Sequence, residues 1–216
     1  EGHRPSVMKE FAKSASLILT DLFPIPPWDK WVRKVSEIAE CPVLEIDCHC
    51  VIPMPLYGKS VDRPFKFRSA TKKLRKERIQ REWPSVTVTP SEYSGELPFT
   101  PIDSESEVAD MTSRFNLLKK CNIDPTVLPV WNEKGGEKAA LAKWGKFLDK
   151  GLSGYARRRN NAADAEGVSK LSSAFHYGFL SPMKVARDAS AVGTKSADKY
   201  LDELLIFREH AWHHIY

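Results

Sequence analysis

Cysteine is scarce in this chain, and a long apolar run is missing. Four cysteines (Cys41, Cys48, Cys50 and Cys121) occur in 216 residues, too few for the disulfide scaffold of a small secreted protein. We therefore expect an intracellular, reducing compartment. No apolar stretch approaches the roughly 20 residues that a helix needs to span a bilayer, so we expect no membrane span. The first residues show neither an initiator Met nor a signal-peptide pattern, which indicates a trimmed start and leaves the localisation unassigned.

Positive charge is concentrated in one segment. Between Arg63 and Trp83 there are nine Lys and Arg against two Glu, which gives this segment a net charge of +7 in a chain whose total is +5. Such a segment suits a phosphate backbone, with an affinity that falls as salt rises. Charge runs are more often the solvated face of a helix, and both interpretations stay open at this point.

Two short apolar runs with a helix between them predict an α/β unit at the start of the chain. Residues 16–20 (SLILT) and 41–47 (CPVLEID) suit buried parallel strands. From Trp28 to Glu40, apolar residues recur every three or four positions, which is typical of an amphipathic helix. A strand–helix–strand unit of this size predicts a parallel sheet. Two or three strands alone make a poor sheet, so we expect residues 1–84 to be an incomplete domain.

The character of the sequence changes twice after this unit. Residues 85–130 mix Pro90, Pro98 and Pro101 with Ser, Thr, Glu and Asp and show no sustained period, which predicts an interdomain linker. From Gly135 the apolar residues repeat with helical spacing, so residues 131–216 are expected to be all-α. The fold class predicted is therefore α/β followed by all-α.

Capping residues predict where the helices of this last part begin and end. Gly151 and Gly154 are expected to mark the end of its first helix. Ser181 followed by Pro182 is expected to open a helix that ends near Gly193. Ser196 is expected to cap the final helix.

Two groups of polar residues in the helical part are candidates for a site. Hydroxyl residues at 169, 172 and 173 precede an apolar helical run, so they either cap that helix or leave its first N–H groups to hold a phosphate. Glu203 and Arg208 lie five residues apart on the last helix. Taken alone, this spacing indicates surface pairing or solvation.

No metal site is expected from the sequence. The histidines His210, His213 and His214 lie near one another, but no carboxylate-plus-His helix motif accompanies them. In the run 48–50 (CHC), an extended strand would place the two cysteines on one face and His49 on the other. Neighbouring residues arranged in that way do not chelate one ion.

The chain resembles the photolyase/cryptochrome family, and most closely the class II cyclobutane-pyrimidine-dimer photolyases. The resemblance covers nearly the whole chain and rests on segments in the family's order: residues 12–35, 41–53 (with Asp47 and His49 as Asp-x-His), 63–76, 122–130, 135–148, 155–160 (YARRRN), 169–182 (SKLSSAFHYGFLSP) and 202–209 (DELLIFRE). It implies an incomplete Rossmann-like antenna domain, a linker, and the first half of a helical FAD-binding domain.

The resemblance also assigns roles to residues. It implies that Ser169, Lys170, Leu171 and Ser172, together with Tyr155, hold the diphosphate of FAD.

For the reaction, the resemblance implies catalytic positions at Glu203, Phe207 and Arg208. The family's residue at the position of Glu203 hydrogen-bonds a flipped-out pyrimidine dimer, and the residue at the position of Phe207 stacks against it. Phe207 stands where the family usually has a stacking Trp, and Ser173 and Ala174 replace the family's Pro and Tyr. The change to Phe keeps an apolar ring but removes the indole N–H donor.

The resemblance therefore implies a flavoprotein that repairs pyrimidine dimers in DNA with light, or that senses blue light. The antenna chromophore is not assigned. The second half of the flavin pocket is missing from the sequence, so we expect this chain alone to bind FAD poorly. The alternative is a photolyase-derived, non-catalytic structural or binding subunit that contacts other protein subunits. A nucleic-acid binder that uses residues 63–83 is a third hypothesis.

Overall fold

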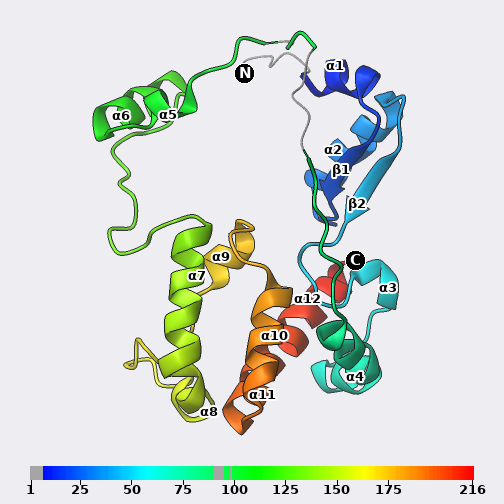
Figure 1. The fold of residues 1–216 in the computed structure, drawn as a ribbon, viewed down its shortest axis with the longest axis vertical. Coiled ribbons are helices and arrows are strands. Elements are labelled where there is room, and N and C mark those ends of the chain that lie inside the picture. Colours follow the sequence, from blue (N-terminus) through cyan, green and yellow to red (C-terminus); the bar gives the residue numbers. More distant parts are fainter. Residues whose placement is uncertain (1–6, 90–94, 98) are drawn as a thin grey trace.

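The computed structural model describes residues 7–89, 95–97 and 99–216. They form a small α/β region, a larger helical region, and a pair of helices that stands apart from both (Figure 1). The chain order is α1 Val7–Ser14, β1 Ile18–Asp21, α2 Trp28–Ile38, β2 Val43–Ile46, α3 Met54–Tyr57, α4 Pro64–Gln80, α5 Ser104–Glu107, α6 Met111–Lys120, α7 Glu137–Lys146, η1 Phe147–Gly151, η2 Leu152–Gly154, α8 Tyr155–Arg158, α9 Ser172–His176, α10 Pro182–Val192, α11 Lys195–Asp202, η3 Glu203–Phe207 and α12 Arg208–Ile215.

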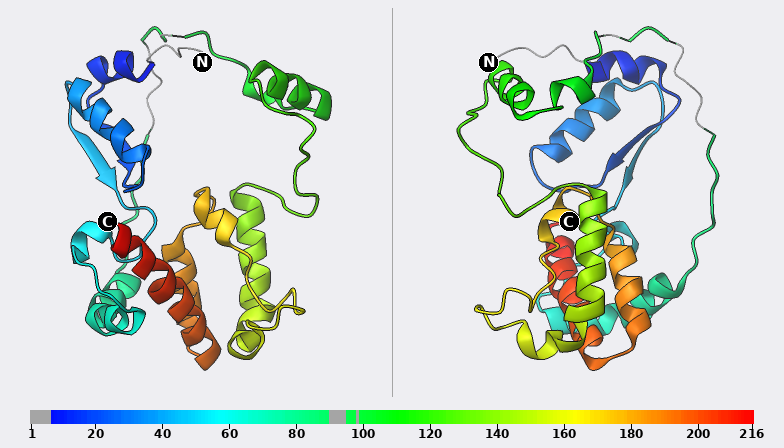
Figure 2. Two further views of the ribbon diagram at one scale, coloured as in Figure 1. Left: turned by 180° about the vertical axis from the view of Figure 1, so that it is seen from behind. Right: turned by 60° about the vertical axis from the view of Figure 1, so that its left-hand side comes forward.

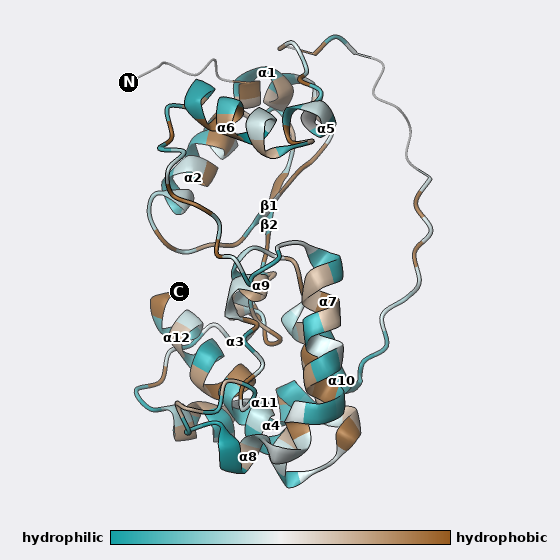
Figure 3. Ribbon diagram, turned by 90° about the vertical axis from the view of Figure 1, so that its left-hand side faces the viewer, coloured by the Kyte–Doolittle hydropathy of each residue, from teal (hydrophilic) through white to brown (hydrophobic). Residues whose placement is uncertain are grey.

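The predicted strand–helix–strand unit is confirmed. Strands β1 and β2 pair in parallel, with Ile18 opposite Val43 and Asp21 opposite Ile46, and α2 connects them. Within the described residues the sheet has two strands. Its side chains are consequently half exposed, for example Leu19 at 58% and Leu44 at 50%, and Figure 3 shows the apolar colour along this pair. Parallel sheets are normally covered on both faces, so this exposure is unusual for a pair of parallel strands.

The first long helix of the helical region does not end at its glycines, which corrects the prediction made for Gly151 and Gly154. Helix α7 continues through a π-turn (η1) and a 3₁₀ turn (η2) into α8. At Gly151 a Cβ atom would lie 2.6 Å from Cε2 of Phe147 and closer still to Cδ2. Gly151 is therefore required by close packing within the helix.

Helix α10 begins and ends as predicted. The Ser181 hydroxyl accepts from the Lys184 N–H, Pro182 occupies the first turn, and Gly193 closes the helix in the left-handed conformation. The cap of the next helix was predicted at Ser196, which is wrong: α11 starts two residues earlier, and its cap is Thr194, whose hydroxyl accepts from the Ala197 N–H. The two hydroxyl residues lie close in sequence, and both belong to the residue types that favour caps.

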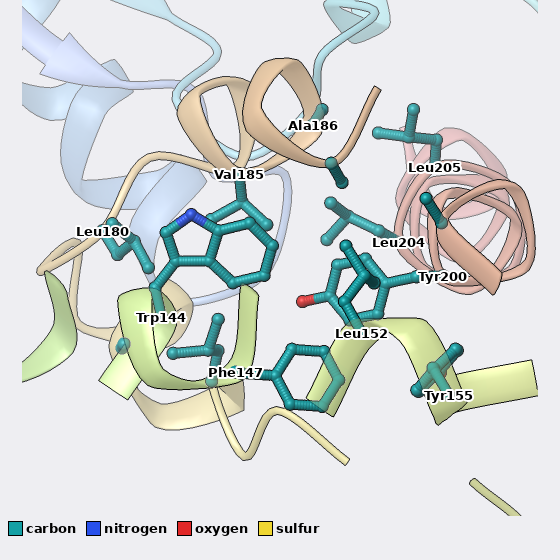
Figure 4. Close-up of a cluster of buried hydrophobic side chains, with 14 of the residues drawn as sticks. Trp144, Phe147, Leu152, Tyr155, Leu180, Val185, Ala186, Tyr200, Leu204 and Leu205 are labelled. Carbon is teal, nitrogen blue, oxygen red and sulfur yellow. The ribbon is translucent and has the colours of Figure 1, made fainter. Parts of the chain in front are cut away.

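An aromatic core joins α7, α10 and α11 (Figure 4). The ring of Tyr200 stacks on Trp144 with centroids 5.7 Å apart and contacts the Phe147 and Tyr155 rings at 5.5 and 5.1 Å. The buried Trp144 indole donates to a carboxylate oxygen of Asp188 at 2.8 Å. This core fixes the positions of Tyr155 and Tyr200.

The segment expected to be a linker contains two short helices, α5 and α6. Asp103 and Asp110 cap them by accepting backbone N–H groups of the first turn. Figures 1 and 2 show this pair away from the helical region, at the end of extended stretches of chain. Among the residues that the structure describes, no helix has the length and apolar character of a membrane span.

The loop after β2 joins the α/β region to the last helix. Asp47 organises it by accepting from the backbone N–H groups of His49, Cys50 and Met54 at 2.7–2.9 Å. Strand β2 ends at Ile46, so residues 47–50 are not the extended strand that the sequence analysis assumed for them. Because of this turn, Cys48 is exposed while Cys50 is buried.

Candidate functional site

A cavity of about 430 Å³ lies where α8, α9, α11 and η3–α12 meet the loop after β2. Five of the eight residues implied by the resemblance line it: Tyr155, Ser169, Ser172, Glu203 and Arg208. They come from three segments that are separated by up to 53 positions in the sequence. A volume of this size falls within the range of small-molecule sites.

Two tyrosines and a serine form one wall of the cavity. The Tyr200 hydroxyl donates to the Ser169 hydroxyl at 3.1 Å, and the rings of Tyr155 and Tyr200 meet edge to face. Burial raises the pKa of Tyr200 to about 12. Burial also raises the pKa of Tyr155, with a smaller contribution from the Glu203 carboxylate. Both phenols are therefore neutral hydrogen-bonding groups at ordinary pH.

A second wall carries charge. The Glu203 carboxylate pairs with Arg159 at 3.0 Å and with Lys199 at 2.8 Å. The Arg208 guanidinium donates to the His49 carbonyl at 2.6 Å and lies 5.5 Å from the centre of the Phe175 ring. With two cations beside Glu203 and a third at Arg208, the wall attracts an anionic ligand.

The π-turn η3 supplies this wall. Glu203 is its first residue, and Arg208 follows directly after it. Single π-turns are rare and are found often at functional sites, where the extra residue changes the direction of the side chains that follow. Nothing in the local sequence predicts such a turn, whose residues pack against α4, α10 and α11.

Three residues implied by the resemblance do not line this cavity. Leu171 is 1% exposed and belongs to the core. Lys170 lies instead on a neighbouring cavity of about 680 Å³, which Lys143, Lys146 and Arg158 also line. Phe207 is 46% exposed, and the Lys199 ammonium lies 5.5 Å from its ring centre.

The hydroxyl groups at 169–173 do not cap a helix. Helix α9 begins at Ser172, its cap position is Leu171, and no side chain accepts from its first turn. The capping interpretation of these hydroxyls is therefore wrong. The first N–H groups of α9 have no intrahelical acceptor, since a helix offers none to its first turn.

Sequence reasoning did not identify the aromatic wall of the cavity. The His49 ring stacks on Trp212 with centroids 4.5 Å apart, and Phe23 meets both rings. The His49 Nε2 atom is buried and has no hydrogen-bond partner within the described part of the chain. Burial lowers the pKa of His49, although the nearby Asp47 acts in the opposite direction. The Asp-x-His pattern was a signal for His49, but nothing local connects it to Trp212.

Another cavity, of about 660 Å³, lies at the carboxyl ends of the two strands. Asp21 and Asp47, which end or follow β1 and β2, line it together with Tyr177 and Arg187. Ligands of open α/β sheets bind at this edge. The structure thus brings a second possible site next to the first, since His49, Phe175 and His176 line both cavities.

The basic segment predicted from the sequence forms most of helix α4. Part of its charge is used within the protein: Arg68 pairs with Asp202 at 2.9 Å, Arg75 donates to Thr71 and to the Arg68 carbonyl, and Arg78 donates to the Val51 carbonyl at 3.1 Å. Lysines 72, 73 and 76 are exposed. These lysines therefore lie on the solvent face of the helix, whereas Arg68 and Arg78 attach it to its neighbours and Arg75 bonds within the helix.

Known proteins with similar sequences belong to the family that the sequence motifs resemble. No family model matches the chain. The deoxyribodipyrimidine photo-lyase of Methanothermobacter thermautotrophicus is 22% identical over 205 residues, which are 95% of this chain and 42% of that protein. The protein of the same name from Arabidopsis thaliana is 26% identical over 204 residues, 90% of this chain and 39% of that protein.

A shorter match has a higher sequence identity. The deoxyribodipyrimidine photo-lyase of Thermus thermophilus is 42% identical over 81 residues, 38% of this chain and 19% of that protein. The chain therefore spans less than half the length of the curated relatives that it matches. These relatives all carry the same name, and the chain resembles part of the deoxyribodipyrimidine photo-lyase family.

Proposed function

We propose that this chain is a portion of a photolyase-like flavoprotein and that the 430 Å³ cavity is its contribution to the FAD site. One observation carries the proposal. Residues to which the resemblance gives roles, Tyr155, Ser169, Ser172, Glu203 and Arg208, line a single cavity although the sequence separates them. Convergence of this kind is expected of a binding site and is not required by helix packing alone.

The chemistry of the cavity fits the proposed cofactor. The hydroxyl residues Tyr155, Ser169 and Ser172 line the cavity and can offer hydrogen bonds to a phosphate. The stacked His49 and Trp212 rings offer a flat apolar surface, and the orphaned His49 Nε2 offers a polar atom. When bound, FAD would supply the light-driven one-electron chemistry that opens a pyrimidine dimer. This chain would hold the diphosphate and shape one side of the cavity.

A charge placed at the cavity tests the binding site directly. Ser172→Glu puts a carboxylate where the diphosphate is proposed to lie, and it should lower FAD affinity by about tenfold or more. Ser173→Glu is the matched control: it adds the same charge to the next residue of α9, which does not line the cavity. Equilibrium dialysis against FAD of the native polypeptide that carries this sequence measures the affinity of both variants. Equal affinities in the two variants would refute the placement of the cofactor.

The proposed activity is tested on the native polypeptide that carries this sequence. Purified from its source, it should contain FAD and should remove cyclobutane dimers from irradiated DNA under blue light but not in the dark. Absence of both flavin and repair would remove the enzymatic proposal and leave the second candidate.

That second candidate is a non-catalytic binding subunit, and specific observations favour it. Glu203 is already neutralised by two cations, and Phe207 is not among the residues that line the cavity. The half-exposed apolar residues of the two-stranded sheet, such as Leu19 and Leu44, suit contacts with further protein. A native assembly in which residues 135–216 contact other chains, with no bound flavin, would support this candidate.

A further inference from the structure

Three potential metal ligands meet in the interior between the loop after β2 and helix α12. They are Cys50, Glu209 and His213, and one ligand atom of each lies within 4.8 Å of the other two. Their exposed fractions are 7%, 0% and 3%. Sulfur, oxygen and nitrogen donors in so small a volume are the combination that Zn²⁺ binds in proteins.

The hydrogen bonding of His213 leaves one ring nitrogen ready to bind an ion. Nε2 lies 3.0 Å from the Ile52 carbonyl, and a carbonyl can only accept, so Nε2 carries the proton. Nδ1 therefore presents a lone pair, and it is buried without a partner among the residues described. Histidine ligands of metals usually show this arrangement, with the second ring nitrogen donating to a backbone carbonyl.

The buried carboxylate of Glu209 forms no direct ion pair with a cation within the described residues, although the Arg208 and Arg75 charges act on it from a distance. Its two oxygens accept the Val51 N–H at 2.7 Å and the Ile52 N–H at 3.3 Å. Each oxygen has a second lone pair, so both can still bind an ion. Burial raises the pKa of Glu209 to about 8, in spite of these two hydrogen bonds and of the Arg208 charge nearby. A cation at this place would offset the cost of burying the carboxylate.

We propose that Cys50, Glu209 and His213 form a structural zinc site that fastens the loop after β2 to helix α12. Ligand bonds of about 2.0–2.3 Å place tetrahedral ligands about 3.3–3.8 Å apart, so a pair of ligand atoms 4.8 Å apart would approach by at most about 1.5 Å on binding. Zn²⁺ displaces the thiol proton of Cys50 and, where Glu209 is protonated, its carboxyl proton. Both protons pass to solvent, and the zinc–sulfur and zinc–oxygen bonds form without any change of oxidation state. A water molecule completes the tetrahedron. The proposal does not depend on flavin binding.

This site differs from both metal sites considered in the sequence. It takes Cys50 without Cys48 and His213 without its neighbouring histidines, and it adds Glu209, one helical turn before His213. Two of the ligands come from α12, and Cys50 lies 159 positions before Glu209. The sequence spacing of metal motifs gives no sign of such a site.

Cobalt substitution of the metal-free chain tests the proposal. After dialysis against a chelator and then against buffer, Co²⁺ should bind with one equivalent per chain and produce the visible d–d bands and thiolate-to-cobalt absorption of a tetrahedral site. Zn²⁺ should displace it. Cys50→Ser and His213→Gln should each lose the thiolate band or the stoichiometric binding. Cys48→Ser and the double variant His210→Gln/His214→Gln are matched controls that should keep both.

A second measurement needs no variant at all. A hundredfold excess of Zn²⁺ over its dissociation constant should raise the melting temperature of the unmodified chain by about 5 °C or more, and a chelator should reverse the rise. Absence of stoichiometric Co²⁺ binding and of any Zn²⁺-dependent rise would overturn the proposal and leave a hydrogen-bonded polar cluster. A thiolate band that persists in Cys50→Ser would overturn it as well.

Discussion

Replacement of Gly151 by Ala should destabilise the chain, although it puts a better helix former into a helix. Gly151 has right-handed helical dihedrals that any residue adopts, so its backbone gives no reason for glycine. The constraint is the Phe147 ring, which a Cβ atom at 151 would approach to 2.6 Å at Cε2, where ordinary contacts lie at 3.4–4 Å. The ring is 6% exposed and contacts the rings of Trp144, Tyr155 and Tyr200, so a shift of the ring would disturb these aromatic contacts.

The size of the effect follows from two opposing terms. Overpacking of a filled core costs about 1–3 kcal/mol. The change from Gly to Ala returns about 0.5–1 kcal/mol, because the unfolded chain loses freedom. We therefore expect a net loss of about 1–2 kcal/mol, which for a chain of this length lowers the melting temperature by about 3–6 °C.

Gly145 provides the control for this experiment. It lies in α7, and a Cβ atom there would meet nothing within 4 Å. Gly145→Ala should thus raise the melting temperature by about 2 °C, since only the favourable term remains. Thermal unfolding followed by circular dichroism measures both variants. The packing explanation fails if Gly151→Ala is as stable as Gly145→Ala.

Three further predictions concern the core, the cavity wall and the basic helix. Asp188→Ala should cost about 1–3 kcal/mol of unfolding free energy in urea titrations, because it leaves the buried Trp144 N–H without its acceptor. Burial raises the pKa of Tyr200 from 10.0 to about 12 in the folded chain, so the stability of the fold should fall as pH rises from about 10 towards 12. Tyr200→Phe should remove this pH-dependent contribution and the matching step in tyrosinate absorbance. Exchange of the exposed α4 lysines Lys72, Lys73 and Lys76 for Gln should weaken DNA binding. It should also reduce the steepness of the fall of log affinity with log salt concentration by up to about 2.7.

Each of these predictions has a control and a contrary result. Lys184→Ala breaks only the exposed pair with Asp188 and should cost about 0.3–0.5 kcal/mol; a cost as large as that of Asp188→Ala would contradict the role of the indole bond. A tyrosinate step near pH 12 that survives in Tyr200→Phe would show that another tyrosine is responsible. For DNA binding, the control variant exchanges three lysines of α1 and α2 for Gln: Lys9, Lys30 and Lys34. An equal loss of affinity in this variant would show that α4 does not contribute more to DNA binding than other lysine-bearing helices.

Local signals predicted local structure well in this chain. Helix α10 was predicted from Ser181, Pro182 and Gly193, because a cap, a first-turn proline and a left-handed glycine each act within a few residues. The strand–helix–strand unit was predicted from two short apolar runs and from the helical spacing of the apolar residues between them, which are also local signals. The expected cap at Ser196 failed by two residues, since Thr194 competes for the same role and tertiary packing selects between them.

The features that shape the candidate site required long-range information. Neither π-turn was predicted, because an extra residue in a helical turn is set by what the turn packs against. The resemblance named Glu203 and Arg208, but the residue that Arg208 contacts, His49, lies 159 positions earlier. The number of charged residues in α4 could not predict which arginines attach the helix to Val51 and Asp202 and which lysines face solvent.

The π-turn η3 sets the rotational position of everything that follows it. Successive residues of an α-helix are about 100° apart, and a π-turn holds one residue more than an α-turn. Glu209 and His213 come after η3, so their direction towards Val51 and Ile52 depends on that additional residue. Deletion of one residue within Glu203–Phe207 would rotate α12 by more than a quarter turn and detach it from the loop, with every contacting side chain still present in the sequence.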